Sequence, residues 1–172
     1  MTISWRDGMD IGDPVIDADH HHLVEMINQF EAAIGGRIDH KAVARVLLGL
    51  VSYTGEHFQR EEDLQLQVRY PYYDSHRRSH RDVLKHLNDL LARYVRLQGA
   101  ERDAMIREMA GFLREWLVDH IISSDLRMKP YVQKFLADQA EAVRRQRAAR
   151  ALAASIAAGP PSSDDWPDPA RH

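Results

Sequence analysis

The sequence contains no cysteine among its 172 residues, so disulfides, thiolate metal sites and thiol nucleophiles are excluded. Any metal must therefore be bound by nitrogen or oxygen donors. The chain also has no basic excess, since its formal net charge is −3 and its isoelectric point is about 6.4. Because a surface that binds nucleic acid needs an excess of lysine and arginine, we expect no nucleic acid among the partners.

Long apolar runs are also missing from the chain. No segment approaches the roughly 18 uninterrupted apolar residues of a membrane-spanning helix. Residues 1–10 contain no basic run followed by an apolar stretch, which would be the pattern of a secretion signal. These absences predict a cytoplasmic protein with no membrane span. A chain of this length with 44% hydrophobic residues can form one compact domain with a short extension.

The chain does contain ten histidines. Five of them and two carboxylates form four spaced clusters: His20; His57 with Glu61; His76 with His80; and His120 with Asp125. Residues four apart on a helix lie on one face, so two of these clusters each direct two donors the same way. His120 and Asp125 are five apart, so the helix must bend or end between them, and Ser123 and Ser124 are the candidate positions.

Apolar residues at helical spacing predict four helices, and the clustered histidines lie on their apolar faces. The helices are expected from a cap at Asp17 to Gly35, from about Asp39 to about Arg69, from after Tyr72 to before Gly99, and through Met105 to Ile121. Four amphipathic helices joined by short loops predict an all-α, antiparallel, up-down-up-down four-helix bundle. Residues 1–16 are expected to form an N-terminal arm that lies on the bundle.

The composition changes after the fourth helix. Residues 131–136 are still amphipathic, whereas residues 137–158 are rich in alanine and arginine and have few large apolar side chains. We therefore expect a bundle domain at 1–136 and an extension at 137–172. In the extension, residues 137–158 are expected to be helical without belonging to the core, and they are a candidate segment for binding a protein partner. Proline, serine and aspartate predict a disordered tail at 159–172.

A single histidine on an apolar helix face is usually a core residue without a ligand, because imidazole can be buried with one hydrogen bond. Five imidazoles and two carboxylates in one small bundle do not fit that alternative, since each unsatisfied buried polar group costs about 1–3 kcal/mol. Seven donors also exceed what one zinc or iron ion accepts with an open position. We therefore expect two metal ions, with Glu61 and Asp125 as the shared ligands. The Glu-x-x-His pattern of ferritin-like di-iron oxidases is absent at the expected positions.

The neighbours of these donors are interpreted as ordinary surface residues. His21 and His22 are expected to face solvent, and His86 lies off the stripe of candidate ligands. By the same helical spacing, Glu62 and Asp63 are expected on a hydrated face rather than among the donors.

Four segments carry a resemblance to a known family: Ile16–Leu23 (IDADHHHL), His57–Glu62 (HFQREE), Tyr70–Pro71 with His76 and His80, and Trp116–Ile121 (WLVDHI) with Asp125. On these motifs the chain resembles the hemerythrin family, specifically bacterial hemerythrins, from Trp5 to about Met128. The resemblance implies two non-haem iron ions, one bound by His76, His80 and His120 and the other by His20 and His57. Glu61 and Asp125 would bridge the ions, with an oxo or hydroxo group as the third bridge.

The resemblance also implies reversible dioxygen binding at an open position of the two-histidine iron. The family positions that line this pocket are Phe58, Trp116, Leu117 and Ile121. The implied role is to carry, store or sense O₂, with no enzymatic turnover. Two alternatives stay open: a di-iron enzyme that reduces peroxide or nitric oxide, and a regulatory module in which the O₂-dependent state of the site changes the contacts of residues 137–158. Gln65 is a departure, because methionine is common at that family position.

Overall fold

The structure, a computed structural model, describes residues 2–158. Its elements are η1 (Asp7–Met9), α1 (Pro14–Ile34), α2 (His40–Gln67), α3 (Tyr73–Tyr94), α4 (Gly99–Ser123), η2 (Asp125–Met128) and α5 (Lys129–Ala158). Residues 2–158 contain no strand, and none of their helices is long and apolar enough to cross a membrane. The expected disordered tail at 159–172 lies outside the described residues.

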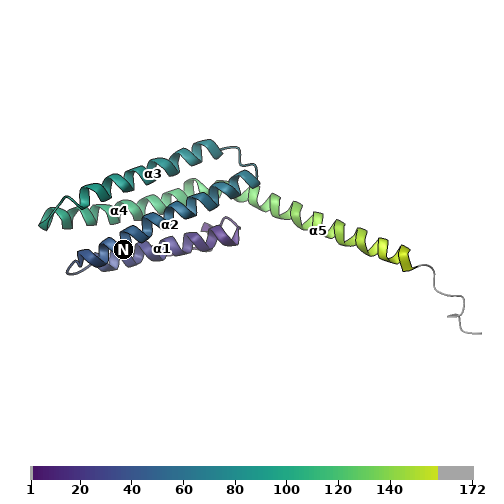
Figure 1. Cartoon of the computed structure of the whole chain (residues 1–172), viewed down its shortest axis with the longest axis horizontal. Coiled ribbons are helices and arrows are strands. Elements are labelled where there is room, and N and C mark those ends of the chain that lie inside the picture. The colour runs from purple at the N-terminus through teal and green to yellow at the C-terminus, as the bar shows by residue number, and fades with distance from the viewer. Residues whose placement is uncertain (1, 159–172) are drawn as a thin grey trace, which may run out of the picture. The chain divides into compact units, whose positions relative to one another are not determined.

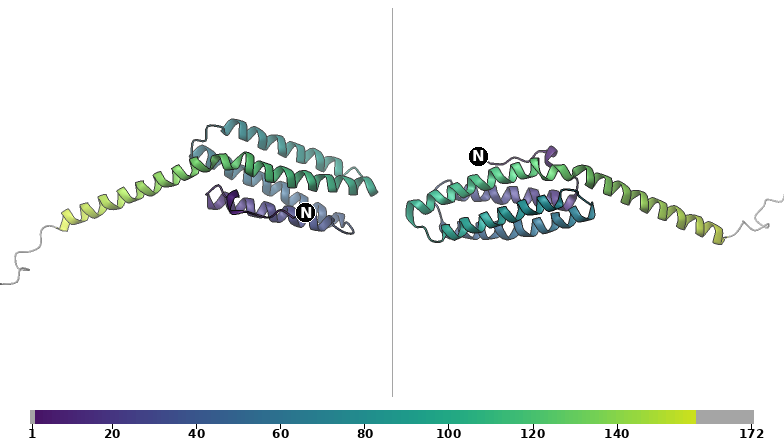
Figure 2. Two further views of the ribbon diagram at one scale, coloured as in Figure 1. Left: turned by 180° about the vertical axis from the view of Figure 1, so that it is seen from behind. Right: turned by 90° about the horizontal axis from the view of Figure 1, so that it is seen from above.

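Helices α1 to α4 form an antiparallel bundle (Figure 1). α1 packs against α2 and α4, α2 packs against α3, and α3 packs against α4, so the ring of helices closes between the first and the fourth. The joining segments 35–39, 68–72 and 95–98 are short, which makes consecutive helices antiparallel neighbours. Figure 2 shows the same arrangement from two further sides. The predicted all-α four-helix bundle is confirmed.

The apolar core follows the predicted stripes. Ten of the stripe residues are at most 3% exposed: Leu23, Ile27, Phe30, Val43, Leu47, Leu50, Leu87, Met105, Met109 and Leu113. Full burial of such a side chain stabilises the folded state by about 1.5–3 kcal/mol. The contacts among these side chains therefore hold the four helices together and fix their rotation about their own axes.

The topology brings four helix ends together at one end of the bundle. Because neighbouring helices are antiparallel, the start of α1, the end of α2, the start of α3 and the end of α4 meet there. His20 lies in the first third of α1, and His57 lies in the second half of α2. His76 is in the first turn of α3, and His120 is in the last turn of α4. The fold thus gathers the predicted donors at a single level of the bundle.

One helix cap differs from the prediction. α1 begins at Pro14, and the Asp13 side chain caps it by accepting hydrogen bonds from the backbone N–H groups of Val15 and Ile16. The predicted cap, Asp17, instead lies inside the helix and accepts from the N–H groups of two residues in the preceding loop. The prediction was wrong by one turn, because a proline with its fixed φ fits the first position of a helix and moves the cap before it.

The predicted break between His120 and Asp125 is present. α4 ends at Ser123, Ser124 is its C-cap, and the chain continues as the 3-10 helix η2, which begins at Asp125. The change from α-helical to 3-10 geometry alters the rotation per residue, so Asp125 returns to the face that carries His120.

The chain divides into two compact units after Gln133. Met128 and Val132 belong to the first unit and are fully buried there. In the second unit, α5 continues to Ala158, and its side chains from Leu136 to Ala157 are exposed. Residues 137–158 are therefore helical, as expected, and a bundle domain that ends at residue 136 stays a prediction.

A truncation series tests this boundary. We expect a chain ended after Ala137 to have the same metal content as the full chain and to melt within about 8 °C of it, because Met128 and Val132 remain in place. A chain ended after Arg127 loses both of these buried side chains and should be less stable by about 3–6 kcal/mol. Thermal unfolding measured by circular dichroism compares the two. A larger loss from the first truncation would mean that the extension contributes to the fold.

Candidate metal centre

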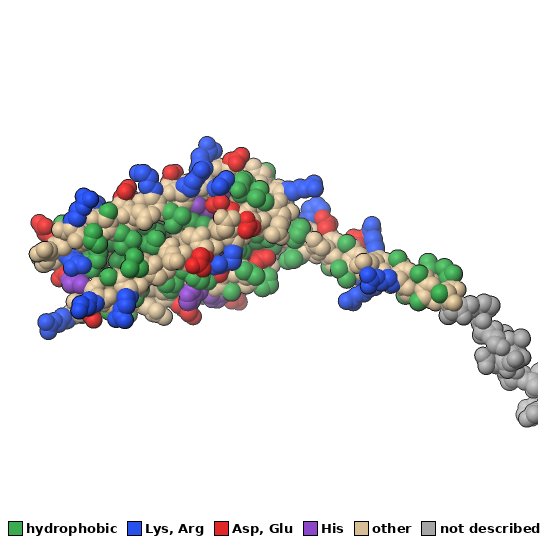
Figure 3. Space-filling view, viewed as in Figure 1, with side chains coloured by type: hydrophobic (Ala, Val, Ile, Leu, Met, Phe, Trp, Pro, Cys, Tyr) green, Lys and Arg blue, Asp and Glu red, His purple; other side chains and the backbone are tan. Residues whose placement is uncertain are grey.

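All seven predicted donors are buried on the inside of the bundle. They are His20, His57, Glu61, His76, His80, His120 and Asp125, and none is more than 6% exposed. By contrast, His21 and His22 are exposed, as the helical spacing predicts. On the face of the bundle seen in Figure 3, basic and acidic side chains are mixed. The carboxylates of Glu61 and Asp125 are fully buried, so their charge lies inside the bundle and not on this surface.

The Asp125 carboxylate stands between two groups of histidines. Its Oδ1 atom lies 3.1 Å from Nε2 of His120 and 3.3 Å from Nε2 of His76. Its Oδ2 atom lies 3.3 Å from Nε2 of His20. The two oxygens of one carboxylate thus face histidines from different helices.

The Glu61 carboxylate makes a similar set of contacts from α2. Its Oε1 atom lies 3.3 Å from Nε2 of His76, and its Oε2 atom lies 3.2 Å from Nε2 of His80 and 3.8 Å from Nε2 of His57. The Nε2 atoms of His80 and His120 are 3.1 Å apart. One donor atom from each of Glu61, His76, His80 and His120 lies within 4.8 Å of the others, which would allow them to share an ion.

The hydrogen bonding of these groups is incomplete in a way that a cation would satisfy. Several buried atoms have no hydrogen-bond partner: both ring nitrogens of His20, Nε2 of His76, Oε2 of Glu61 and both carboxylate oxygens of Asp125. Each such atom costs about 1–3 kcal/mol when it stays unsatisfied. Adjacent donors are 3.1–3.3 Å apart, the spacing expected of ligands about 2.0–2.1 Å from one ion. The nitrogen and oxygen donors present therefore fit a transition-metal ion.

Both carboxylates are held in the ionised form that a metal needs. Burial opposes ionisation of Glu61, but the neighbouring imidazoles of His76 and His80 hold its pKa well below the usual range. Burial and the charge of Glu61 oppose ionisation of Asp125, but His120 and His20 still keep its pKa below the usual value. Two adjacent buried negative charges strongly favour a bound cation.

Aromatic rings cover the histidines on one side. The Phe58 ring stacks on His80 with ring centroids 3.7 Å apart, and the Trp116 ring stacks on His120 at 4.9 Å. Leu117 is 1% exposed and Ile121 is fully buried, and both lie on α4 within one turn of His120. These four residues are the predicted pocket lining: the rings of Phe58 and Trp116 contact donor histidines, and Leu117 and Ile121 are buried near His120 along α4. Their role in binding O₂ stays a prediction.

Three polar residues at the centre were not among the predicted donors. Glu62, expected on a hydrated face, accepts a hydrogen bond from Nδ1 of His80 at 3.0 Å, and its side chain is only 12% exposed, so that prediction was wrong. Asp19 is buried beside His57, and its spacing of four residues before Leu23 was the available signal. Gln65 is fully buried and donates to Oε1 of Glu61 at 3.4 Å.

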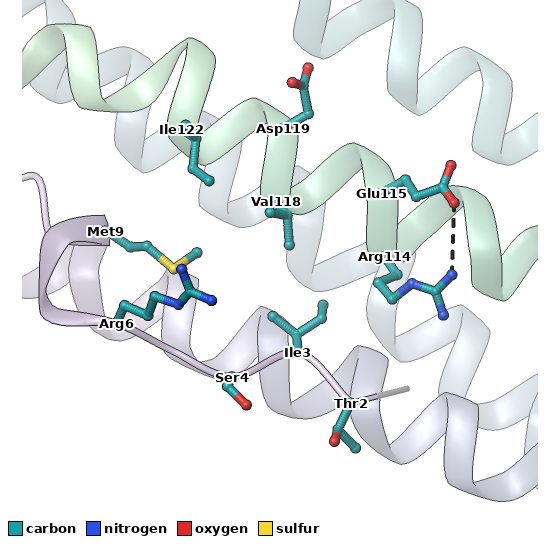
Figure 4. Close-up of a pocket in the computed structure, with 10 residues that line it drawn as sticks. All are labelled: Thr2, Ile3, Ser4, Arg6, Met9, Arg114, Glu115, Val118, Asp119 and Ile122. Atoms are coloured by element: carbon teal, nitrogen blue, oxygen red, sulfur yellow. Dashed lines mark ion pairs between the residues drawn. The ribbon is translucent and has the colours of Figure 1, made fainter.

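A surface cavity of about 640 Å³ lies between the N-terminal segment and α4 (Figure 4). Ile3 and Met9 face Val118 and Ile122 across it, and none of the seven predicted donors lines it. This cavity is therefore separate from the metal centre, whose donors are packed in the interior of the bundle.

Comparisons with known proteins give related sequences and a solved structure of similar fold. The chain is 35% identical over 121 residues to the bacteriohemerythrin of Pseudomonas aeruginosa (strain LESB58), covering 70% of this chain and 75% of that protein. It is 29% identical over 126 residues to a hemerythrin-like protein of Naegleria gruberi, covering 73% and 90%. A crystal structure of a hemerythrin mutant covers 77% of this chain and 98% of its own, with a TM-score of 0.66 and 20% identity, so the two folds are alike.

The family comparison covers the whole bundle. Residues 12–132 match the family described as Hemerythrin HHE cation binding domain. This range includes all four bundle helices and every predicted donor. The chain therefore belongs to the hemerythrin family.

Proposed function

We propose that this chain holds two iron ions and binds dioxygen reversibly at them. The observation that carries the proposal is the position of Asp125, whose Oδ1 faces His76 and His120 while its Oδ2 faces His20. A carboxylate that served one ion would not need histidines on both sides. This arrangement supports a carboxylate shared between two ions.

The donors would divide between the ions as the family resemblance implies. His76, His80 and His120 would hold one iron, and His20 and His57 the other. Glu61 and Asp125 would be shared, with an oxo or hydroxo group as the third bridge. The second ion then has one protein ligand fewer than the first, which leaves a position for a small ligand.

When bound, the iron pair supplies the two electrons that reversible dioxygen binding requires. The contribution of the chain is to keep water and protons away from that position. Phe58 is 2% exposed, and Leu117 and Ile121 are still less exposed. An apolar wall of this kind favours release of intact O₂ over its loss to a side reaction with water.

Binding without turnover is also supported by the other polar residues of the interior. Among residues 2–158, the buried polar side chains other than the seven donors and the tyrosines Tyr70 and Tyr94 are Asp19, Thr54 and Gln65. Asp19 already accepts from three side chains, Gln65 carries an amide and Thr54 a hydroxyl. None of these is a free acid or base suited to proton transfer at neutral pH.

The experiment that tests the function is a gas-exchange cycle. The iron-loaded protein is reduced under anaerobic conditions, exposed to O₂ and then flushed with argon, while its visible spectrum is recorded. We expect a charge-transfer band that appears with O₂ and disappears under argon. A band that never reverses, or steady consumption of peroxide or nitric oxide with an electron donor, would favour the enzyme alternative.

The metal content is a separate prediction. We expect about two iron ions per chain after expression with iron. Seven donors, two of which are carboxylates that can be shared, are too many for one ion and fit a pair. Elemental analysis of the purified protein measures this ratio. A single metal ion per chain, or stoichiometric zinc under these conditions, would contradict the proposed centre.

A further inference from the structure

Asp19 lies beside the metal centre without facing its interior. Its carboxylate is 6% exposed and accepts hydrogen bonds from three side chains. The Tyr53 hydroxyl donates to Oδ1 at 2.6 Å, and the Arg60 guanidinium donates to Oδ2 at 2.7 Å and to Oδ1 at 3.0 Å. Nδ1 of His57 lies 3.4 Å from Oδ2.

The tyrosine and the arginine fix Asp19 independently of the histidine. The Arg60 guanidinium donates to both oxygens of the Asp19 carboxylate, and a charge-assisted pair of this kind fixes the orientation of the carboxylate. Burial and the contact with Asp19 raise the pKa of Tyr53 to about 12, so its hydroxyl remains a donor. The Arg60 guanidinium also lies over the Tyr53 ring, 5.4 Å from its centroid. Asp19 is thus a charged acceptor with a fixed orientation.

A second set of residues repeats this arrangement at another donor histidine. Glu62 accepts from Nδ1 of His80 through Oε1 at 3.0 Å, and its Oε2 lies 3.1 Å from Nε of Arg77. The Arg77 guanidinium lies over the Tyr73 ring at 5.9 Å, as Arg60 does over its own tyrosine. In both places a carboxylate is held by an arginine and faces the outer nitrogen of a donor histidine.

We propose that Asp19 with Arg60, and Glu62 with Arg77, are two positioning pairs that each hold one metal-binding histidine in a single tautomer. An ionised carboxylate can only accept, so the proton of the ring must lie on Nδ1. Nε2 then keeps its lone pair, and this atom faces Glu61 in both His57 and His80. Such partners orient the ring and increase its basicity towards a metal.

The inference rests on the proposed two-iron centre and assigns one pair to each ion. His57 belongs to the two-histidine iron and His80 to the three-histidine iron, so the pairs act on different ions. Removing one pair should therefore weaken the binding of one ion and leave the binding of the other unchanged. A residue that only stabilises the fold would affect both ions together.

The first measurement is the release of iron from the reduced, fully loaded full-length protein to a ferrous chelator. We expect Asp19→Leu to speed release of one iron about 10–100-fold while the other leaves at the wild-type rate. Glu62→Leu should speed release of the other iron, and the double variant should lose both quickly. Asp19→Asn keeps an acceptor oxygen and should restore part of the slow release. Asp63→Leu, which changes an exposed carboxylate next to Glu62, is the control and should release iron as the wild type does.

The second measurement needs no metal, so it separates failure of this inference from failure of the proposed function. Long-range ¹H–¹⁵N spectra of the metal-free full chain report the ring tautomers of His57 and His80. We expect the Nδ1–H tautomer for both in the wild type, and a mixture for His57 in the Asp19 variants. Two results would overturn the inference. One is an Nε2–H tautomer in the wild type. The other is that Asp19→Leu speeds the release of both irons equally and also lowers the stability of the metal-free protein.

Discussion

Replacing His76 with alanine is expected to remove iron and to lower the melting temperature of the iron-loaded protein by at least about 8 °C. Nε2 of His76 lies 3.3 Å from both Glu61 and Asp125, so this ring contacts both of the proposed shared carboxylates. A ligand present at about 1,000 times its dissociation constant stabilises the folded state by about 4 kcal/mol, and that contribution disappears with the metal. Elemental analysis and thermal melts recorded with and without iron measure the two effects.

His86→Ala is the matched control for this variant. His86 lies on the same helix, α3, but it is exposed. Within residues 2–158 the ring of Phe112 is its only aromatic contact. We expect this variant to keep about two irons and to melt close to the wild type. The difference in melting temperature between His76→Ala and the wild type should also shrink when iron is removed from both. Unchanged iron content in His76→Ala would refute its assignment as a ligand.

Replacing Leu117 with a polar residue is expected to leave both irons bound but to shorten the lifetime of the O₂-bound form. Leu117 lies three residues before His120 on α4 and is 1% exposed, so asparagine there would place an amide beside the centre. Water and protons would then reach the bound oxygen more easily, and decay to the inactive oxidised form should be about tenfold faster, the effect of a 1.4 kcal/mol lower barrier. The decay of the visible band in air measures this rate.

Leu113→Asn controls for the general cost of a buried amide. Leu113 is on the same helix one turn further from His120, and it is 2% exposed. It should lose stability to a similar extent without a change in the decay rate. Equal decay rates in the wild type and the Leu117 variant, with iron retained, would show that Leu117 does not shield the bound ligand. Faster decay in both variants would show that the effect comes from loss of stability.

Much of the fold follows from local spacing. The three adjacent histidines illustrate this, because only His20 lies three, four and seven residues before apolar residues of its helix, and only His20 is buried. The break between His120 and Asp125 was also predictable, since two side chains five residues apart cannot share a face of a regular α-helix. Such features depend only on the helical repeat, which is the same in every helix.

The outer partners of the donors depended on contacts between segments that are distant along the chain. Arg60 reaches Asp19 across 41 residues, and His80 reaches Glu62 across 18. A carboxylate next to a donor can face solvent, the metal or another side chain, and the helical repeat alone did not separate these cases for Glu62. The N-terminal cap was misplaced for a local reason, because Asp17 and Asp13 both have capping side chains and Pro14 decides between them.

The sequence by itself determined the all-α bundle, the inward faces of its helices and the set of buried donors. Only the tertiary structure decided that Asp125 directs one oxygen to His76 and His120 and the other to His20. Helical periodicity specifies which side chains share a face, but not how far one helix is shifted or rotated against the next. Those relative positions are set by packing of the whole core, and they decide which donors stand about 3 Å apart.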